Sequence, residues 1–143
     1  MSPVLRRIVH ALLYELIGIV IVSLGLMLLS GHGIARTGFV AVACSLIAVA
    51  WNYIFNTLFE AWEARQSVRG RGFLRRAAHA CGFEVGLTLL LVPLLAWWLE
   101  VSLIEAFLYD GTLILFFLVY TFLFNLGFDR VFGLPASARP LDL

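Results

Sequence analysis

Charged residues are scarce in this chain of 143 residues, at 13%, and lysine is missing altogether, so all ten basic residues are arginine. A soluble domain carries about 25% charged and about 45–50% apolar residues. Here 62% of the residues are hydrophobic and the mean hydropathy is +0.99. The shortage of charge excludes an ordinary soluble domain, and the length leaves room for four membrane spans of about 20 residues each. We therefore predict an all-α membrane protein.

Cysteine is almost as rare as lysine. The two cysteines, Cys44 and Cys81, lie inside apolar segments, where a small buried side chain is favoured over a disulfide or a metal ligand. The sequence contains no P-loop, no His/Cys metal spacing and no nucleophile elbow. A net charge of +1 gives nothing to attract nucleic acid. These absences predict a protein that is not an enzyme and binds no metal, cofactor or nucleic acid.

Four apolar stretches can span a bilayer: residues 8–29, 39–59, 77–99 and 106–128. Glu15 interrupts the first stretch, which argues against a cleavable signal peptide. All the arginines except Arg36 fall near the two termini or in the connection of residues 60–76. By the positive-inside rule, both termini and this central connection are predicted to be cytoplasmic. The chain is therefore expected to form two helical hairpins of the same orientation.

Two sequence blocks recur at one offset of 69 residues, which indicates an internal duplication. The first block is RRIVHALLYE at residues 6–15, repeated as RRAAHACGFE at residues 75–84. The second is WNYIFNTLFE at residues 51–60, repeated as YTFLFNLGFD at residues 120–129. We predict two tandem transmembrane hairpin repeats, covering residues 1–69 and 70–143.

Each copy places an acid inside an apolar segment. Glu15 and Glu84 both lie about seven residues from the predicted cytoplasmic boundary. A carboxylate at such a depth costs a few kcal/mol and is a functional candidate by default. It can hold a proton or a cation but not both cheaply, and this exclusion is the physical basis of proton–cation antiport. The alternative is that each acid only forms a hydrogen bond between helices.

A third acid has no counterpart in the first copy. Asp110 lies about five residues inside the last span from the outer side, at the position where the first copy has Ala41. It is either a further coupling carboxylate on the exit side or a residue that snorkels to the outer interface. The proton and substrate coupling candidates are therefore Glu15, Glu84 and Asp110.

Polar and aromatic side chains recur along the second and fourth spans at helical spacing. Amides and aromatic faces beside an acid suit an organic cation, which pairs with the charge and stacks on the rings. The alternative is that the asparagines join helices and the rings simply pack. The candidate substrate-binding residues are Tyr14, Trp51, Asn52, Phe55, Asn56, Tyr120 and Asn125.

Two histidines lie within one turn of the predicted cytoplasmic interface. His10 and His79 occupy equivalent positions in the two copies, beside the arginine pairs. Either they relay protons between the cytoplasm and the membrane acids, or they bond the cytoplasmic ends of the second and fourth spans. Both interpretations stay open from the sequence.

The repeated motifs resemble the signatures of the proteobacterial antimicrobial compound efflux (PACE) family, which is built from a tandem bacterial transmembrane pair domain. The motifs are R-x-x-H-A-x-x-[FY]-E at residues 7–15 and 76–84, W-N-x-x-F-N-x-x-F-E at residues 51–60, and Y-T-x-x-F-N-x-x-F-D at residues 120–129. They cover essentially the whole chain. One departure is Leu126-Gly127, where an aromatic residue is common in the family.

The resemblance implies a proton-coupled exporter in the bacterial inner membrane. Its expected cargo is a cationic biocide such as chlorhexidine or acriflavine, or a short-chain diamine, and the expected partners are the lipid bilayer and protons. It also implies that Glu15 is the main proton and substrate residue, and it allows for a homodimer. Two alternatives compete with this interpretation. One is a small multidrug resistance type of exporter, disfavoured by the tandem repeat and the strong arginine bias. The other is a non-transporting assembly or sensor module whose acids serve helix packing.

Overall fold

The computed structural model describes residues 2–68 and 72–133, and within them the chain is all-helical. Its four helices are α1 (Pro3–Ser30), α2 (Ile34–Ala64), α3 (Phe73–Leu99) and α4 (Leu103–Phe132). Each is long and apolar enough to cross a membrane. At 1.5 Å per residue, about 20 residues cross the hydrocarbon, so each helix extends beyond it. The predicted all-α fold with four spans is confirmed.

The helices begin and end where local capping chemistry allows. Ser2 and Ser102 are the N-caps of α1 and α4, and their hydroxyls accept hydrogen bonds from the backbone N–H groups of Leu5 and Glu105 at 3.2 and 3.1 Å. Gly31 ends α1 in the left-handed conformation, with φ at 73°. Hydropathy placed the start of the second span at residue 39, but α2 already begins at Ile34. The apolar stretch indicates the part of α2 that lies in the bilayer, and the helix extends beyond it to its N-cap, Gly33.

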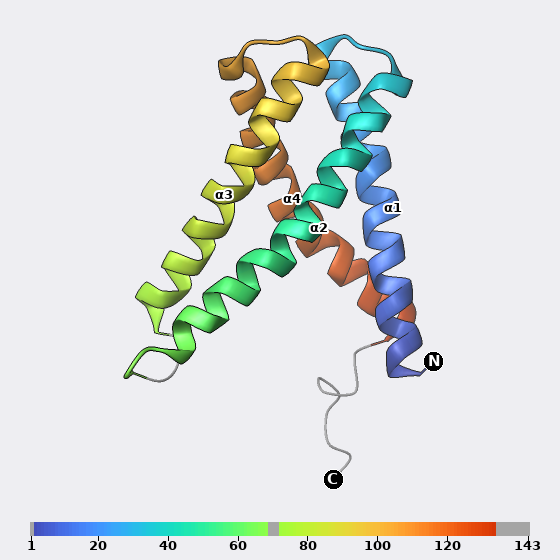
Figure 1. Cartoon of the computed structure of the whole chain (residues 1–143). Helices are drawn as coiled ribbons and strands as arrows, with labels where there is room; N and C mark the ends of the chain where they lie inside the picture. Colours follow the sequence, from blue (N-terminus) through green and yellow to red (C-terminus); the bar gives the residue numbers. More distant parts are fainter. Residues whose placement is uncertain (1, 69–71, 134–143) are drawn as a thin grey trace.

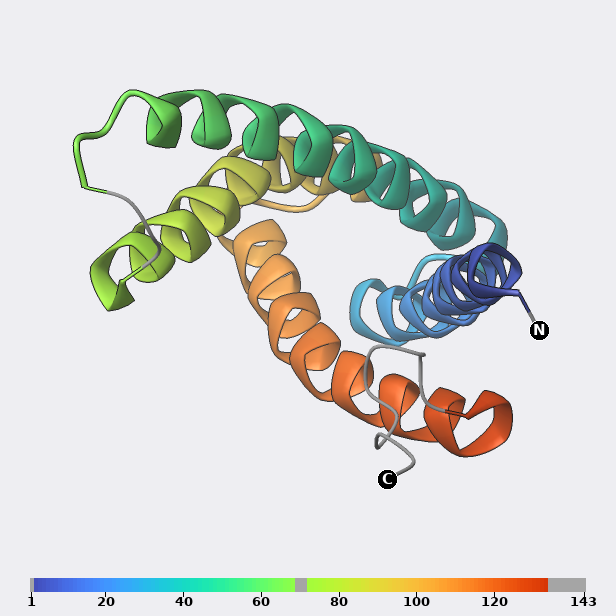
Figure 2. The same ribbon diagram turned by 90° about the horizontal axis from the view of Figure 1, so that it is seen from below.

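The helices form two hairpins whose turns lie at the same end of the molecule (Figure 1). We call this the turn end. The start of α1, the end of α2 and the start of α3 lie at the opposite end, which we call the terminal end. The main contacts join α1 with α2, α3 with α4, α2 with α3 and α1 with α4. The four helices therefore close a ring, which Figure 2 shows from the terminal end.

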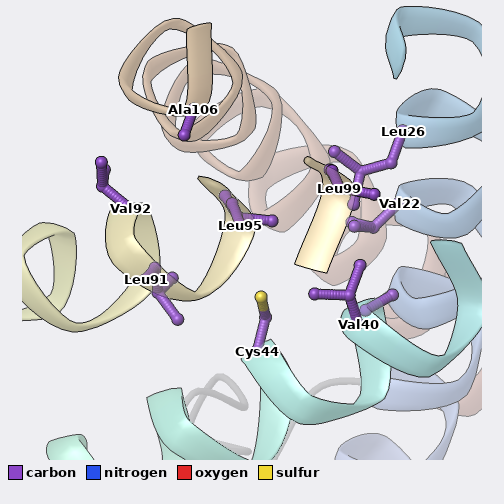
Figure 3. Close-up of a cluster of buried hydrophobic side chains, with 10 residues drawn as sticks. Val22, Leu26, Val40, Cys44, Leu91, Val92, Leu95, Leu99 and Ala106 are labelled. Carbon is purple, nitrogen blue, oxygen red and sulfur yellow. The ribbon is translucent and has the colours of Figure 1, made fainter. Parts of the chain in front are cut away.

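The apolar core lies toward the turn end and joins the two hairpins (Figure 3). Leu26 of α1, Val40 of α2 and Leu95 of α3 are fully buried there. Two polar contacts reinforce the same end, because Arg36 donates to the Trp98 carbonyl at 2.6 Å and the Trp98 indole donates to the Arg36 carbonyl at 2.8 Å. The bundle is therefore closed at the turn end.

Candidate functional site

A cavity of about 420 Å³ lies directly beneath the core and is lined by all four helices. It shares Val22, Ala41, Cys44 and Leu91 with the core and continues toward the terminal end. Among the described residues that line it, none carries a positive charge. Its polar and acidic lining residues are Tyr14, Glu15, Ser45, Asn52, Glu84, Asp110 and Thr121.

Glu15 lies on the α1 wall of this cavity, where it is half-buried. The hydroxyl of Ser45 on α2 donates a hydrogen bond to its carboxylate. A hydroxyl donor stabilises a carboxylate that water does not reach freely. The acid is therefore held by the partner helix of its own hairpin, with its side chain at the cavity.

Asp110 and Glu84 lie on the walls that the second hairpin contributes. Asp110 of α4 is only 3% exposed, and its carboxylate accepts a hydrogen bond from the Thr88 hydroxyl of α3 at 2.8 Å. Glu84 lies one helical turn before Thr88, on the same face of α3. Both Glu84 and Asp110 line the cavity. The three predicted coupling acids thus meet at one cavity, although they come from three helices.

Tyr14 and Asn52 complete the predicted residues that reach the cavity. The Tyr14 hydroxyl bonds the Thr121 hydroxyl at 2.8 Å, and its ring lies edge-on to Phe124 at 5.3 Å between centroids. Asn52 accepts a hydrogen bond from the side-chain amide of Asn56, one turn further along α2. These contacts fix one aromatic ring and one amide at the end of the cavity nearest the terminal end.

The other predicted residues lie in two seams between the hairpins, nearer the terminal end. His10 of α1 bonds the Asn125 amide oxygen of α4 at 2.7 Å, and His79 of α3 bonds the Asn56 amide oxygen of α2 at 2.7 Å. Each histidine also packs edge-on against phenylalanine rings of the facing helix. The residues found in the seams rather than on the cavity wall are His10, His79, Trp51, Phe55, Asn56, Tyr120 and Asn125.

The seams share a second contact that different side chains make in each repeat. Trp51 donates from its indole to the Phe83 carbonyl at 3.0 Å. Tyr120, its equivalent 69 residues later, donates from its hydroxyl to the Tyr14 carbonyl at 2.8 Å. The two seams therefore have equivalent contacts: α2 packs on α3 in one seam, and α4 packs on α1 in the other.

Each seam also contains an ion pair, which lies nearer the terminal end than the histidine. Arg6 contacts Asp129 at 2.5 Å, and its guanidinium lies over the Phe128 ring at 5.0 Å. In the other seam Arg75, the equivalent of Arg6, faces Glu63 at 4.0 Å. The repeat would have paired it with Glu60 instead. The acid partner is thus shifted by about one helical turn between the two copies.

Comparison with known proteins assigns the family. The family model described as chlorhexidine efflux transporter matches residues 2–65 and matches again over residues 71–134. Together the two matches cover nearly the whole chain. The chain belongs to this family. It is therefore a multi-pass membrane protein built from a tandem, two-part arrangement, as the repeated motifs predict.

Curated relatives of this efflux-family member carry a more specific name. The short-chain diamines transporters of Vibrio parahaemolyticus, Acinetobacter baylyi and Acinetobacter baumannii are 35%, 36% and 37% identical to it over 126 residues. The alignments cover 88% of this chain and 89%, 89% and 87% of the respective relatives. No solved structure matches the chain.

Two hydroxyls of this efflux-family member were missed by the motif reasoning. Ser45 and Thr88 each bond a membrane acid, yet neither lies in a repeated block. Helical spacing could have found them, because Ser45 lies two turns before Asn52 and Thr88 lies one turn after Glu84. Small polar residues on the face of a helix that carries an acid are therefore an informative signal.

Proposed function

We propose that the protein exports small organic cations across the bacterial inner membrane in exchange for protons. One observation carries the proposal: three carboxylates face one membrane cavity that has no basic side chain among its described lining residues. Unpaired negative charge in hydrocarbon is costly, so such a cavity is stable only with protons or cations bound. The cargo leaves chemically unchanged, and the protein acts as a transporter and not as an enzyme.

Glu15 is proposed as the principal coupling residue. A proton on Glu15 removes the charge that attracts a cation, and a bound cation disfavours protonation of the same carboxylate. Ser45 can donate to the carboxylate in its ionised form and so supports the cation-bound state. Glu84 and Asp110 take part in the same exchange from the second hairpin. The proton gradient drives export because protons reload the acids from the outer side.

The cargo is proposed to be a short-chain diamine or a cationic biocide of the chlorhexidine class. The names of the relatives and of the family supply both possibilities. Three aromatic rings, Tyr14, Phe83 and Phe117, line the cavity and offer faces for a cation. Its volume of about 420 Å³ is within the range of about 300–1,000 Å³ that is usual for ligand sites.

The seams are proposed to form the gate on the terminal side, which the arginine distribution predicts to be cytoplasmic. The turn end is packed with apolar side chains, whereas the terminal end is held by polar and aromatic seam contacts. Such contacts exchange partners more readily than a close-packed core. Cargo would therefore pass Trp51, Phe55, Asn56, Tyr120 and Asn125 on its way to the acids. The resemblance to the family adds a homodimer to the proposal.

Transport by reconstituted protein tests the proposal. Purified protein in liposomes loaded with a pH-sensitive dye is expected to change the lumenal pH when a cationic drug or a diamine is added. Glu15→Gln should abolish that change. Glu105→Gln serves as the matched control, because Glu105 is an exposed acid in the first turn of α4, away from the cavity. Normal transport by Glu15→Gln would overturn the mechanism.

A further inference from the structure

The two seams have equivalent polar contacts but differ in how closely their helices pack. Both contain a bond between a histidine and an asparagine, and both contain an arginine paired with an acid. In the seam between α2 and α3, the rings of Trp51 and Phe55 lie directly on the backbone of α3 at Gly86 and Gly82, and an added Cβ on Gly86 would overlap the indole. Small residues let membrane helices approach this closely. Separation of α2 from α3 would therefore lift both rings out of close-packed contact.

The seam between α1 and α4 is packed less closely. The α1 positions equivalent to the two glycines are Leu13 and Ile17, so no glycine admits the rings of α4 at these places. The buried glycine of α1 is Gly18, where an added Cβ would lie 3.6 Å from the Phe117 ring, at ordinary van der Waals distance. In addition, residues 65–72 join α2 to α3 at the terminal end, whereas α1 and α4 are the first and last helices. The chain therefore ties α2 to α3 at this end but does not tie α1 to α4.

A hydrogen bond joins α1 to α4 at the level of the cavity. The Tyr14 hydroxyl bonds that of Thr121 at 2.8 Å, and both residues line the cavity, as does Glu15. The equivalent residues of the other seam are Phe83, which has no hydroxyl, and Asn52. Two hydroxyls that separate can each bond water instead, so this contact parts more readily than rings packed on a backbone.

We infer that cargo enters between α1 and α4, and that the seam between α2 and α3 stays closed and acts as the hinge of the opening. The bond between Tyr14 and Thr121 must part before cargo reaches Glu15 by this route. The inference rests on the proposed function, in which both seams belong to one gate, and adds which of the two seams moves. The rings of the seam between α2 and α3 then form a fixed wall of the entrance.

A reversible metal bridge across each seam tests the inference. His10 and His79 each lie 2.7 Å from an asparagine oxygen of the facing helix, so Asn125→His and Asn56→His each place two imidazoles close enough to share one zinc ion. Zinc should join α1 to α4 in the first variant and α2 to α3 in the second. Formation of each bridge is measured as a rise in the unfolding midpoint of the variant when zinc is added.

Transport by each variant in liposomes is compared before zinc, with zinc and after a chelator. The zinc concentration is one that leaves transport by the wild type unaffected. Zinc should reduce transport by Asn125→His at least about tenfold, and the chelator should restore it, because the bridged entrance cannot open. Transport by Asn56→His should change less than about twofold on addition of zinc. A zinc block of both variants, of neither, or of Asn56→His alone would overturn the inference.

Removal of the bond between Tyr14 and Thr121 gives a second test that needs no metal. Tyr14→Phe introduces the residue that the second repeat has at this position, and Thr121→Ala removes the other hydroxyl. The association rate of a fluorescent cation with protein in nanodiscs should rise at least about threefold in each variant, and no further in the double variant, because both changes remove one bond. Loss of a contact that only stabilises the bundle or only binds cargo would not speed association. Unchanged or slower association in either variant would contradict the assignment.

Failure of the proposed function would look different. In that case Glu15→Gln would keep proton-driven transport, whichever seam the metal blocks. Loss of transport in Glu15→Gln, together with a zinc block of Asn56→His and not of Asn125→His, would instead reject only the choice of seam. The two sets of measurements therefore separate the two ideas.

Discussion

The indole of Trp51 on α2 lies against the backbone of Gly86 on α3. A Cβ atom placed on Gly86 would be 2.1 Å from the indole Cζ2, which is far inside van der Waals contact. One turn earlier on α3, a Cβ on Gly82 would be 3.1 Å from the ring of Phe55. The Gly-x-x-x-Gly spacing therefore packs α3 against the aromatic stripe of α2, as small residues do between membrane helices.

Gly86→Ala is expected to destabilise the protein. Overpacking of a close contact costs about 1–3 kcal/mol, which exceeds the gain of about 0.5–1 kcal/mol that alanine normally brings to a helix interior. Gly111→Ala is the matched control, because a Cβ on Gly111 of α4 meets nothing within 4 Å. Unfolding midpoints in detergent should fall for Gly86→Ala and stay or rise for Gly111→Ala. Equal shifts in the two variants would contradict the packing argument.

Replacing Trp51 with a smaller aromatic residue should restore part of the stability that Gly86→Ala loses. Trp51→Tyr puts at this position the residue that the second repeat has at Tyr120. In the background of Gly86→Ala, the smaller ring makes room for the added methyl group. The combined variant should therefore be more stable than Gly86→Ala alone. A double-mutant cycle should give a coupling energy of about 1 kcal/mol between the two changes. Additive effects of the two changes would show that the residues do not interact.

Much of the fold can be predicted from the sequence. Hydropathy predicts which segments span the membrane, and the internal repeat predicts that the two hairpins are equivalent. The apolar stretches had to become spans, since a bilayer leaves a backbone few other ways to satisfy its hydrogen bonds. The duplication also appears in the packing, because Trp51 and Tyr120 occupy equivalent positions and bond the carbonyls of Phe83 and Tyr14, which are themselves equivalent. The apolar stretches predict the part of each helix that crosses the bilayer, whereas the helices continue beyond it, for example to the N-cap Ser102 of α4, because capping is independent of hydropathy.

The site was harder to read from the sequence than the fold. Asn56 and Asn125 were predicted to bind cargo, but in the structure they bond His79 and His10 across the seams, which is the contact that the second interpretation of the histidines describes. Lipid-facing and protein-facing surfaces of a membrane helix are both apolar, so hydropathy does not tell which helix is the neighbour. Glu84 and Asp110 lie 26 positions apart in sequence. Only the packing of α3 against α4 shows that Glu84 and Asp110 line the same cavity.

Removal of the Ser45 hydroxyl should weaken cation binding. Ser45→Ala deletes the donor to Glu15, and hydrogen bonds to charged groups contribute about 1.5–3 kcal/mol. We expect affinity for a fluorescent organic cation to fall by at least about tenfold, because the ionised form of Glu15 loses its donor. Ser45→Thr keeps a hydroxyl at the same position and should restore most of the binding. Wild-type affinity in Ser45→Ala would show that the bond does not support the cation-bound state.

The histidines should act through their hydrogen bonds to asparagine. His10→Gln keeps an amide that can bond Asn125 but does not titrate near neutral pH, whereas His10→Ala loses the bond. If the seam contact is what matters, the glutamine variant retains most transport in liposomes and the alanine variant loses it. His79→Gln and His79→Ala should repeat the result at Asn56. Loss of transport in both glutamine variants would favour a proton relay instead.

Cation binding should weaken as the pH falls, because protons compete for the same carboxylates. For one displaced proton, the apparent affinity of a monocation changes by at most about tenfold per pH unit. Fluorescence titration of a cationic dye across the acidic to neutral range measures this slope directly. Glu15→Gln should bind the dye weakly and with a much flatter pH dependence, while Glu105→Gln should follow the wild type. A wild-type affinity that is independent of pH would mean that protons and cations do not share a site, and the exchange between them would have no physical basis in this cavity.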